Sequence, residues 1–240
     1  MSKLFLLPNV LSEEVDLWQH VPARLQEIVV HLDGLVGESE KEARRYLKRF
    51  VFPEGRSFRD IPLYTLNEHT KREEISEIVH SMQNKVFGLI SDAGLPCIAD
   101  PGAELIALSR RNQVDIETIS GPSSLVFAIQ LSGLPCQNFA FHGYLPQDHK
   151  ERRETILRLE QESKKEKRTQ ICIEAPYRSM TLLQALIETL GEHTLLSIST
   201  RLTTSDEETI TLPIALWKKR SLIDLNKKET VFLFRAAIIP

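Results

Sequence analysis

Residues 86–102 read VFGLISDAGLPCIADPG, and this stretch decides the fold. The apolar run 86–90 is typical of a short buried strand, and it ends in small and turn-forming residues. Asp100 is expected to cap a helix that begins at Pro101, because Asp is a favoured cap and Pro is tolerated at the first helical position. A strand, a loop and a helix start in this order predict the carboxyl edge of an open α/β sheet, where such sheets bind ligands.

The loop 91–102 also has a purely structural interpretation, because any turn from a strand into a helix uses Gly, Pro and Asp. Its length favours a functional interpretation. The loop has twelve residues, whereas an ordinary connection of this kind needs roughly two to six.

Composition limits the class of protein. The 240 residues are 42% hydrophobic and 26% charged, and the formal net charge is −3, so no overall field attracts nucleic acid or a membrane, although a local basic face stays open. Cys97, Cys136 and Cys172 are widely spaced in apolar sequence, which predicts buried thiols in a reducing compartment and no metal site. The apolar start is too short for a signal peptide and no run reaches membrane-spanning length, so a cytoplasmic location is expected.

The first half alternates strands and helices, as a doubly wound parallel sheet does. The charged helix 39–50 carries Arg44, Arg45, Lys48 and Arg49, and a solvated face is favoured there over a substrate clamp. The predicted strands are 3–7, 28–32, 62–66, 86–90 and 114–119, and the predicted helices are 13–28, 39–50, 71–82 and 103–111.

The segment 120–124, SGPSS, is the clearest internal boundary and predicts two domains, 1–119 and 120–240. In the second half two strands follow one another without a full helix between them, which indicates a mixed sheet. The helix 148–168 is expected to be solvated, with an RNA-facing basic strip as the alternative. The predicted strands are 139–146, 169–173, 195–200, 207–212 and 230–234, and the predicted helices are 125–131, 148–168, 179–190 and 214–219.

Common catalytic and phosphate-binding motifs are missing. The sequence has no GxGxxG, GxxxxGK[ST], GxSxG or HExxH pattern. Instead, three loops of small residues, 91–102, 120–124 and 174–178, follow predicted strands. Such loops suit a ligand that is held by backbone amides.

These loops carry a family resemblance. SDAGLP at 91–96 and ADPG at 99–102 resemble the S-D-A-G-T-P-x-I-S-D-P-G signature of the tetrapyrrole methylase superfamily, nearest to the branch of the 16S ribosomal RNA cytidine 2′-O-methyltransferases. GPSS with SGLP, FHGYLP and EAPYR resemble further segments of that branch. The matches stand in the family's order over about 90 residues, which makes the set specific.

The resemblance implies an α/β fold of two α/β domains, with a mostly parallel N-terminal sheet and a mixed C-terminal sheet. It also implies S-adenosylmethionine in the cleft between the domains and a homodimer, and no metal is expected. Carried over by position, the cofactor contacts would be Pro8, Asp92, Ala93, Gly94, Leu95, Ile98, Ser123, Ser124, Ile173, Glu174 and Ala236.

The chain departs from the family pattern where the branch would hold its substrate. The family loop P-T-P-I-G-N-L-x-D-I-T is replaced at residues 8–16, which keep little beyond Pro8 and a late Asp. At residues 38–44 the acidic and basic residues of the family's E-D-T-R segment are present at altered spacing. Of the family's A-R-E-L-T-K segment, this chain keeps only Arg201 and Thr203. The resemblance therefore supports the cofactor more than the RNA substrate.

The implied chemistry is an in-line displacement at a sulfonium methyl, for which the protein mainly aligns donor and acceptor. A hydroxyl acceptor would need a base, and Glu68 or His69 at a strand end is the candidate, with a capping segment as the structural alternative. Arg178 and Arg201 would position an anionic substrate. We expect a methyltransferase that acts on RNA, with ribosomal RNA or the small ribosomal subunit as partner. The alternatives are a tetrapyrrole or other small-molecule acceptor and a non-catalytic S-adenosylmethionine-binding protein.

Overall fold

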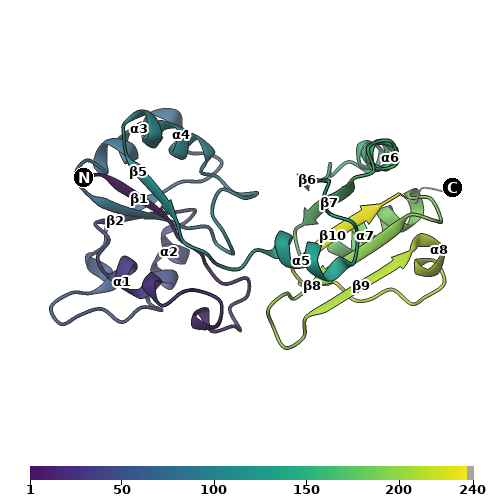
Figure 1. The fold of residues 1–240 in the computed structure, drawn as a ribbon, viewed down its shortest axis with the longest axis horizontal. Helices are drawn as coiled ribbons and strands as arrows, with labels where there is room; N and C mark the ends of the chain where they lie inside the picture. The colour runs from purple at the N-terminus through teal and green to yellow at the C-terminus, as the bar shows by residue number, and fades with distance from the viewer. Residues whose placement is uncertain (237–240) are drawn as a thin grey trace. The chain divides into compact units, whose positions relative to one another are not determined.

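The computed structural model describes residues 1–236 and divides the chain into two compact units, Met1–Ser123 and Ser124–Pro240 (Figure 1). The division falls a few residues beyond the one expected after residue 119.

A five-stranded parallel sheet forms the centre of the first unit. Its strand order is β3-β2-β4-β1-β5, and every neighbouring pair is parallel. The carboxyl ends of all five strands therefore lie along one edge. The strands are β1 (Lys3–Leu6), β2 (Gly34–Gly37), β3 (Leu63–Thr65), β4 (Val86–Leu89) and β5 (Asp115–Thr118).

Helices cover both faces of this sheet (Figure 1). One core packs α1 (Arg24–Val30) and α2 (Glu40–Leu47) against one face, and a second core packs α3 (Arg72–Ser81) and α4 (Ala103–Arg111) against the other. The chain moves along the sheet in one direction from β1 to β3 and in the other from β3 to β5. The connections that leave the adjacent strands β1 and β4 therefore run in opposite directions, and ligands bind at such a switch point.

Two predicted elements near the N-terminus are wrong. The predicted helix 13–28 is replaced by a short 3₁₀ helix, Leu17–Gln19, followed by α1. The predicted strand 28–32 is the last turn of α1, whose Ile28, Val29 and Val30 are buried, because a short apolar run fits a buried helix as well as a strand. The second strand is Gly34–Gly37, where a Cβ on Gly34 would lie 2.6 Å from the Phe87 ring.

The second unit has a mixed five-stranded sheet with the order β6-β7-β10-β8-β9. β6 and β7 are parallel, and the other pairs are antiparallel, so the predicted mixed sheet is confirmed, as is the α/β class. The strands are β6 (Phe139–Tyr144), β7 (Thr169–Glu174), β8 (Leu195–Thr200), β9 (Glu208–Pro213) and β10 (Thr230–Arg235).

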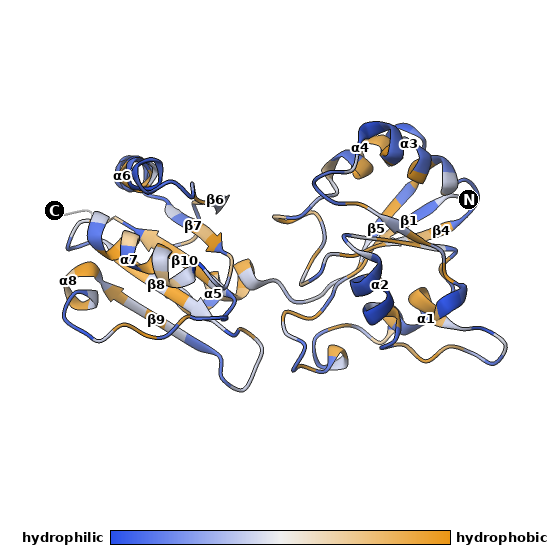
Figure 2. Cartoon of the chain, turned by 180° about the vertical axis from the view of Figure 1, so that it is seen from behind, coloured by the Kyte–Doolittle hydropathy of each residue, from blue (hydrophilic) through white to orange (hydrophobic). Residues whose placement is uncertain are grey.

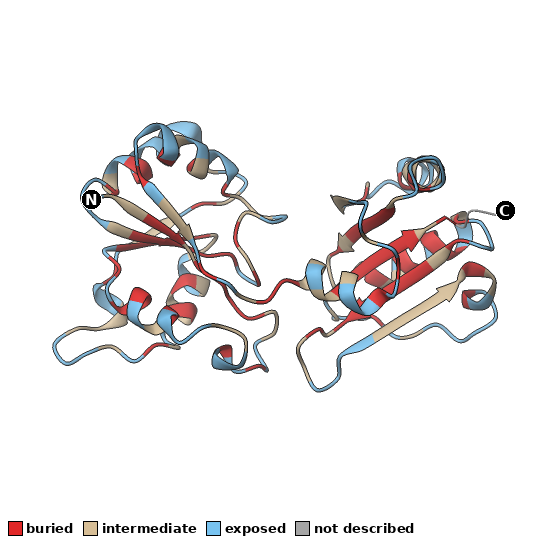
Figure 3. Cartoon of the chain, in the orientation of Figure 1, coloured by how far each residue is buried: buried red, intermediate tan, exposed pale blue. Residues whose placement is uncertain are grey.

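The two faces of the second sheet are covered by different helices. α6 (His149–Glu166) and α7 (Ser179–Thr189) enclose a core that includes Trp217 of α8 (Ile214–Trp217). α5 (Ser124–Ser132) packs on β8, β9 and β10. Apolar residues concentrate on the strands and α7, whereas α6 is mostly hydrophilic (Figure 2). The inner strands of both sheets are buried (Figure 3).

The cysteines differ in burial. Cys172 is fully buried, and this burial raises the pKa of its thiol to about 12. Cys97 and Cys136 are only partly buried, so the expectation that all three thiols are buried is wrong for these two. Within residues 1–236 no helix is long and apolar enough to cross a membrane.

Candidate functional site

Loops from three neighbouring strands meet at the switch point of the first sheet. They are the loop after β1, which begins at Pro8, the loop 91–102 after β4, and the segment after β5 that contains Gly121. Because β4, β1 and β5 are adjacent and parallel, these loops leave the same edge side by side. Two of the predicted cofactor segments, Pro8 and 92–98, are therefore brought together.

Asn9 joins the first loop to the loop 91–102. Its side chain is buried, and Nδ2 donates to the carbonyl oxygens of Ser91 at 3.1 Å and Asp92 at 2.9 Å. Its backbone N–H donates to the Gly94 carbonyl at 2.8 Å, and the Gly94 N–H donates to the Val10 carbonyl at 3.2 Å. One residue thus fixes the path of both loops. Sequence reasoning missed it; the only available signal was an Asn directly after the proline that ends β1.

Two glycines allow the three loops to approach one another. Gly94 has φ +68°, and a Cβ there would lie 3.1 Å from Leu11 Cδ2 and 3.5 Å from the Pro122 carbonyl oxygen. A Cβ on Gly121 would lie 2.1 Å from Cβ of Pro8, closer than real side chains allow. The loops are therefore packed backbone against side chain, with no room for a larger residue.

The predicted cap of the next helix is wrong. α4 begins at Ala103 with Gly102 as its N-cap, at φ +150° and without a side-chain cap, so Asp100 does not cap it. The reason is the path of the loop: Cys97 and Ala99 both have φ +68°, and Cys97 Sγ lies 2.4 Å from where a Cβ of Gly102 would be. Left-handed backbone at non-glycine residues is costly and is found preferentially at functional sites.

Carboxylates gather at this edge. The Asp92 N–H donates to Glu38 Oε1 at 3.2 Å, and Glu38 follows β2 directly. Burial raises the pKa of Glu38, Asp92 and Asp100, and the negative charge of Asp92 adds to the rise at the other two. These side chains therefore form a partly desolvated negative site, which favours a cationic ligand over an anionic one.

The exposed part of the loop 91–102 offers varied contacts. Asp92, Ala93 and Ile98 are exposed, the last with 42% of its surface, whereas Pro8 and Gly94 are buried. Leu95 is half-buried. A ligand at this loop would meet one carboxylate, two apolar side chains and exposed main chain.

Glu68 and His69 lie away from the switch point. Both follow β3, the edge strand, which is separated from β4 by β2. Their side chains are 83% and 84% exposed, and His69 Nε2 is 3.5 Å from Glu68 Oε1. These two side chains therefore contact each other, and their catalytic role stays a prediction.

Arg178 is bound to Glu174 in the second unit. Glu174 is buried, and its Oε1 accepts from Arg178 Nε at 2.9 Å, from Arg178 Nη2 at 2.6 Å and from the Ala175 N–H at 2.8 Å. The guanidinium also lies 5.5 Å from the ring centroid of Tyr177. One oxygen of the Glu174 carboxylate, Oε1, thus accepts three hydrogen bonds within its own loop.

The remaining predicted residues lie at two edges of the second sheet. Glu174 and Thr200 both pair with Thr230, so Glu174 and Arg201 share one edge. Ala236 follows the other end of β10, where its N–H donates to Ser163 Oγ at 3.0 Å. The structure therefore brings Ile173, Glu174 and Arg201 together and separates Ala236 from them. Ser123 ends the first unit and Ser124 begins α5.

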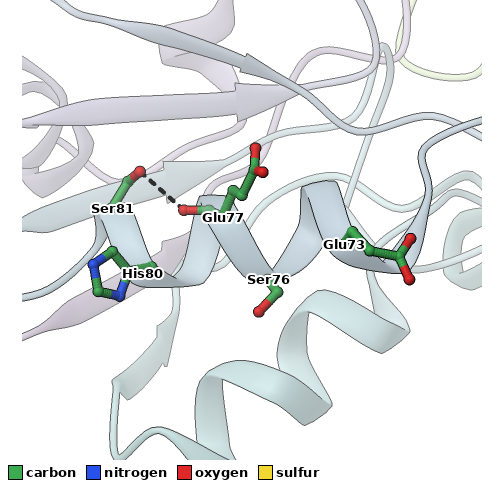
Figure 4. A pocket seen from close by; sticks show the side chains of 5 residues that line it. All are labelled: Glu73, Ser76, Glu77, His80 and Ser81. Atoms are coloured by element: carbon green, nitrogen blue, oxygen red, sulfur yellow. Dashed lines mark hydrogen bonds between the residues drawn. The ribbon is translucent and has the colours of Figure 1, made fainter.

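A hollow of about 520 Å³ on α3 holds none of the predicted site residues. It is lined by Glu73, Ser76, Glu77, His80 and Ser81 (Figure 4). The Ser81 hydroxyl donates to the Glu77 carbonyl at 2.9 Å, while Ile75, Ile78 and Val79 face the core. The hollow is the outer face of an amphipathic helix, and we assign no function to it.

Comparison with known proteins gives three findings. The family model described as Tetrapyrrole (Corrin/Porphyrin) Methylases matches residues 18–216. A Thermotoga maritima protein named ribosomal RNA small subunit methyltransferase I is 32% identical over 193 residues, which are 80% of each chain. The Escherichia coli protein of the same name is 28% identical over 231 residues, covering 95% of this chain and 75% of that one.

Solved structures show the same fold. The methyltransferase CobJ aligns with a TM-score of 0.63 and 13% identity over 99% of this chain and 95% of its own. A uroporphyrin-III-C-methyltransferase from Thermus thermophilus aligns with a TM-score of 0.53 and 14% identity over 98% and 94%. At these identities the likeness concerns the fold alone.

Proposed function

Because the chain belongs to the tetrapyrrole methylase family, and is thus a methyltransferase that uses S-adenosylmethionine, we propose that its methyl acceptor is a ribose 2′-hydroxyl of small-subunit ribosomal RNA. The observation that carries the proposal is the 32% identity over 193 residues to the Thermotoga maritima ribosomal RNA methyltransferase. CobJ and the uroporphyrin-III-C-methyltransferase support the fold and carry no argument about the acceptor.

The switch-point loops fit the cofactor. S-adenosylmethionine carries a sulfonium, an ammonium and a carboxylate, so it has net positive charge near neutral pH. Glu38, Asp92 and Asp100 provide the opposite charge in a partly desolvated setting. Ile98 and Leu95 provide apolar surface for an adenosine, and the backbone of the loop provides hydrogen-bond groups.

Bound S-adenosylmethionine supplies an electrophilic methyl group, so the chain's own task is alignment. Asn9 holds the loop after β4 against the loop after β1 through two side-chain hydrogen bonds. Gly121 keeps the third loop in contact with Pro8. These contacts are made between the loops themselves, so they restrict the backbone freedom of the loops and lower the entropic cost of binding.

We extend the proposal to the acceptor side. Glu68 or His69 would take the proton of the ribose hydroxyl, and Arg178 and Arg201 would position the anionic substrate. Within the second unit Glu174 already orients the Arg178 guanidinium. The proposed cofactor contacts of that unit are Ile173, Glu174, Ser124 and Ala236. A homodimer is part of the same proposal, and light scattering of the purified protein tests it.

The test is transfer of labelled methyl groups from S-adenosylmethionine. The acceptors are small ribosomal subunits, free small-subunit RNA and uroporphyrinogen III, with RNA taken from a strain that lacks the gene. We expect label in the RNA, in a dinucleotide that resists alkali because its 2′-hydroxyl is blocked. Glu73→Gln, on the outer face of α3, serves as an unaffected control.

Other outcomes would contradict the proposal. Label in uroporphyrinogen III alone would identify a small-molecule methyltransferase. Calorimetric binding of S-adenosylmethionine without transfer to any acceptor would identify a non-catalytic binding protein.

A further inference from the structure

A second hollow of the first unit is basic. It measures about 360 Å³ and is lined by Arg44, Lys48, Phe58 and Arg59. Arg44 and Lys48 come from the last part of α2 and the residue after it, and Phe58 and Arg59 come from the 3₁₀ helix Phe58–Asp60 that precedes β3. We call these four residues the basic hollow.

Within residues 1–236, two of the three cations of the basic hollow have no ion-pair partner, unlike their neighbours on α2. In the part of the chain that the structure describes, Lys48 and Arg59 form no ion pair, and the Glu40 carboxylate lies 3.9 Å from Arg44 Nε. By contrast, Arg45 and Arg49 on the same helix both contact Glu13, at 3.2 Å and 3.1 Å. Two cations that form no ion pair among the described residues therefore lie side by side in the lining of the hollow.

The hollow is held in shape by its own contacts. Arg44 Nη1 donates to the carbonyls of Phe58 at 2.9 Å and Ile61 at 3.0 Å, which fixes the 3₁₀ helix against α2. The Arg59 guanidinium lies 4.9 Å and Lys48 Nζ 5.8 Å from the centroid of the Phe58 ring. Asp60, the acidic residue of this turn, accepts the Ser57 N–H at 2.7 Å. A planar guanidinium stacked on a ring is well placed to bind phosphate oxygens.

The hollow lies away from the switch point. α2 starts next to Glu38 at the carboxyl edge, whereas the 3₁₀ helix immediately precedes the amino end of β3. From Glu40 to Lys48 the helical rise is about 12 Å, which exceeds the screening length of roughly 8 Å at physiological salt. The two ends of α2 therefore present separate fields.

A polyanion needs such an anchor in this protein. The formal net charge is −3, and the carboxylates at the switch point repel phosphates. Residues 44–61, in contrast, include six basic and two acidic residues. We infer that the basic hollow binds backbone phosphates of the RNA substrate, outside the methyl-transfer site. This inference rests on the proposed function.

Cations near the end of a helix also complement its dipole, so the experiment includes a matched control. The test variant is Lys48→Ala with Arg59→Ala. The control is Arg110→Ala with Arg111→Ala, which removes two exposed cations from the last turn of α4 on the other face of the sheet. Arg44 is left in place because it holds the 3₁₀ helix.

The probe is a short fluorescein-labelled single-stranded RNA, and the readout is anisotropy over a series of salt concentrations. We expect the test variant to bind about tenfold more weakly at low salt, with the salt slope smaller by about 1.4, as expected for two lost phosphate contacts. The control should bind within a factor of about two of the wild type. Calorimetry with S-adenosylmethionine and thermal unfolding should be unchanged for both variants.

Three results would overturn the inference: equal RNA binding by both variants, no RNA binding by the wild type at low salt, or binding of phosphatidylglycerol vesicles in place of RNA. Methyl transfer to small subunits separates this inference from the proposed function. If the test variant transfers methyl groups with an unchanged KM for RNA, the hollow does not bind RNA, and the proposed function stands. If the wild type binds RNA through the hollow but transfers no methyl group, the proposed function is wrong, and RNA binding by the hollow stands.

Discussion

The two ends of α2 carry opposite charge. Its start follows Glu38 at the switch point, where the cofactor is proposed to bind, and its end, with Arg44 and Lys48, lines the basic hollow. The formal net charge of −3 shows neither region, because the acidic and basic side chains nearly cancel over the whole chain. This unit thus separates its charges along one helix: the acidic end suits a cationic cofactor, and the basic end suits an anionic nucleic acid.

Stability alone does not explain the acidic end. Carboxylates near a helix N-terminus are favoured by the dipole by about 0.3–1 kcal/mol, and that interaction lowers a pKa. Burial raises the pKa of Glu38 instead. The charge on Glu38 is thus costly in the folded protein, which is typical of a residue kept for binding.

We expect the largest effect on stability and cofactor affinity where Gly121 lies against Pro8. Gly121→Ala places a Cβ 2.1 Å from Pro8 Cβ, so the backbone must move. We expect a loss of about 2–3 kcal/mol in the free energy of unfolding and a loss of S-adenosylmethionine affinity of about 100-fold, measured by denaturant titration and calorimetry. Gly191→Ala, where the nearest atom is Glu160 Oε1 at 3.3 Å, should change neither. Unchanged binding by Gly121→Ala would place the cofactor elsewhere.

Asn9→Ala tests the same switch-point loops, and a smaller effect on cofactor affinity is expected. It removes the donor for the Ser91 and Asp92 carbonyls, so we expect a loss of about 1–3 kcal/mol in unfolding free energy. Cofactor affinity should fall by roughly 10–100-fold because the loop loses its anchor. Asn67→Ala, which removes a side-chain acceptor for the His69 N–H at the edge strand, is the matched control. The acidic end would lose its assigned role if both variants bound the cofactor equally well.

Glu38→Gln separates charge from geometry. Gln keeps an oxygen for the Asp92 N–H and removes the negative charge. We expect affinity for S-adenosylmethionine to fall about tenfold, as expected for a nearby partly buried charge, while affinity for neutral S-adenosylhomocysteine changes little. Glu40→Gln, whose side chain is 73% exposed, should alter neither affinity. An equal loss for both ligands would mean that Glu38 acts through loop geometry.

The smallest effect is a dependence on pH. Since burial raises the pKa of Glu38, Asp92 and Asp100, these groups take up protons at a higher pH than free carboxyls, which titrate near about 4. We expect cofactor affinity to decline as the pH falls through the raised values. Stability should move the other way in that window, because the folded state binds protons more readily than the unfolded state. Calorimetry between neutral and mildly acidic pH measures the decline, and Glu38→Gln should flatten it.

Much of the fold was predictable from local patterns. The apolar run 86–90 and the alternation of strands and helices up to β5 predict a parallel sheet in the first half. Two strands without a full helix between them predict a mixed sheet in the second half. The loop 91–102 was also recognisable, since its small residues follow a strand. Its internal path was not, because left-handed Cys97 and Ala99 place the helix start at Ala103 and not at Pro101.

The site contained one contact that no local pattern reveals. Asn9 acts through hydrogen bonds to residues more than eighty positions away, and a sequence shows such a bond only once the strand order is known. Glu68 and His69 were chosen because they follow a strand, but the sequence does not show where in the sheet that strand lies. β3 is the edge strand of the order β3-β2-β4-β1-β5, and a strand's place in that order is a property of the whole chain.

The position of β1 has a consequence for biosynthesis. β1 is made before its partners: within residues 1–236 it pairs with β4 and β5, whose pairing residues end at Thr118. At about 5–20 residues per second, the ribosome needs roughly 6–22 seconds after β1 is made to deliver both partners. We expect the nascent strand to lack at least one neighbour throughout that interval, so a chaperone at the tunnel exit would find one of its edges accessible.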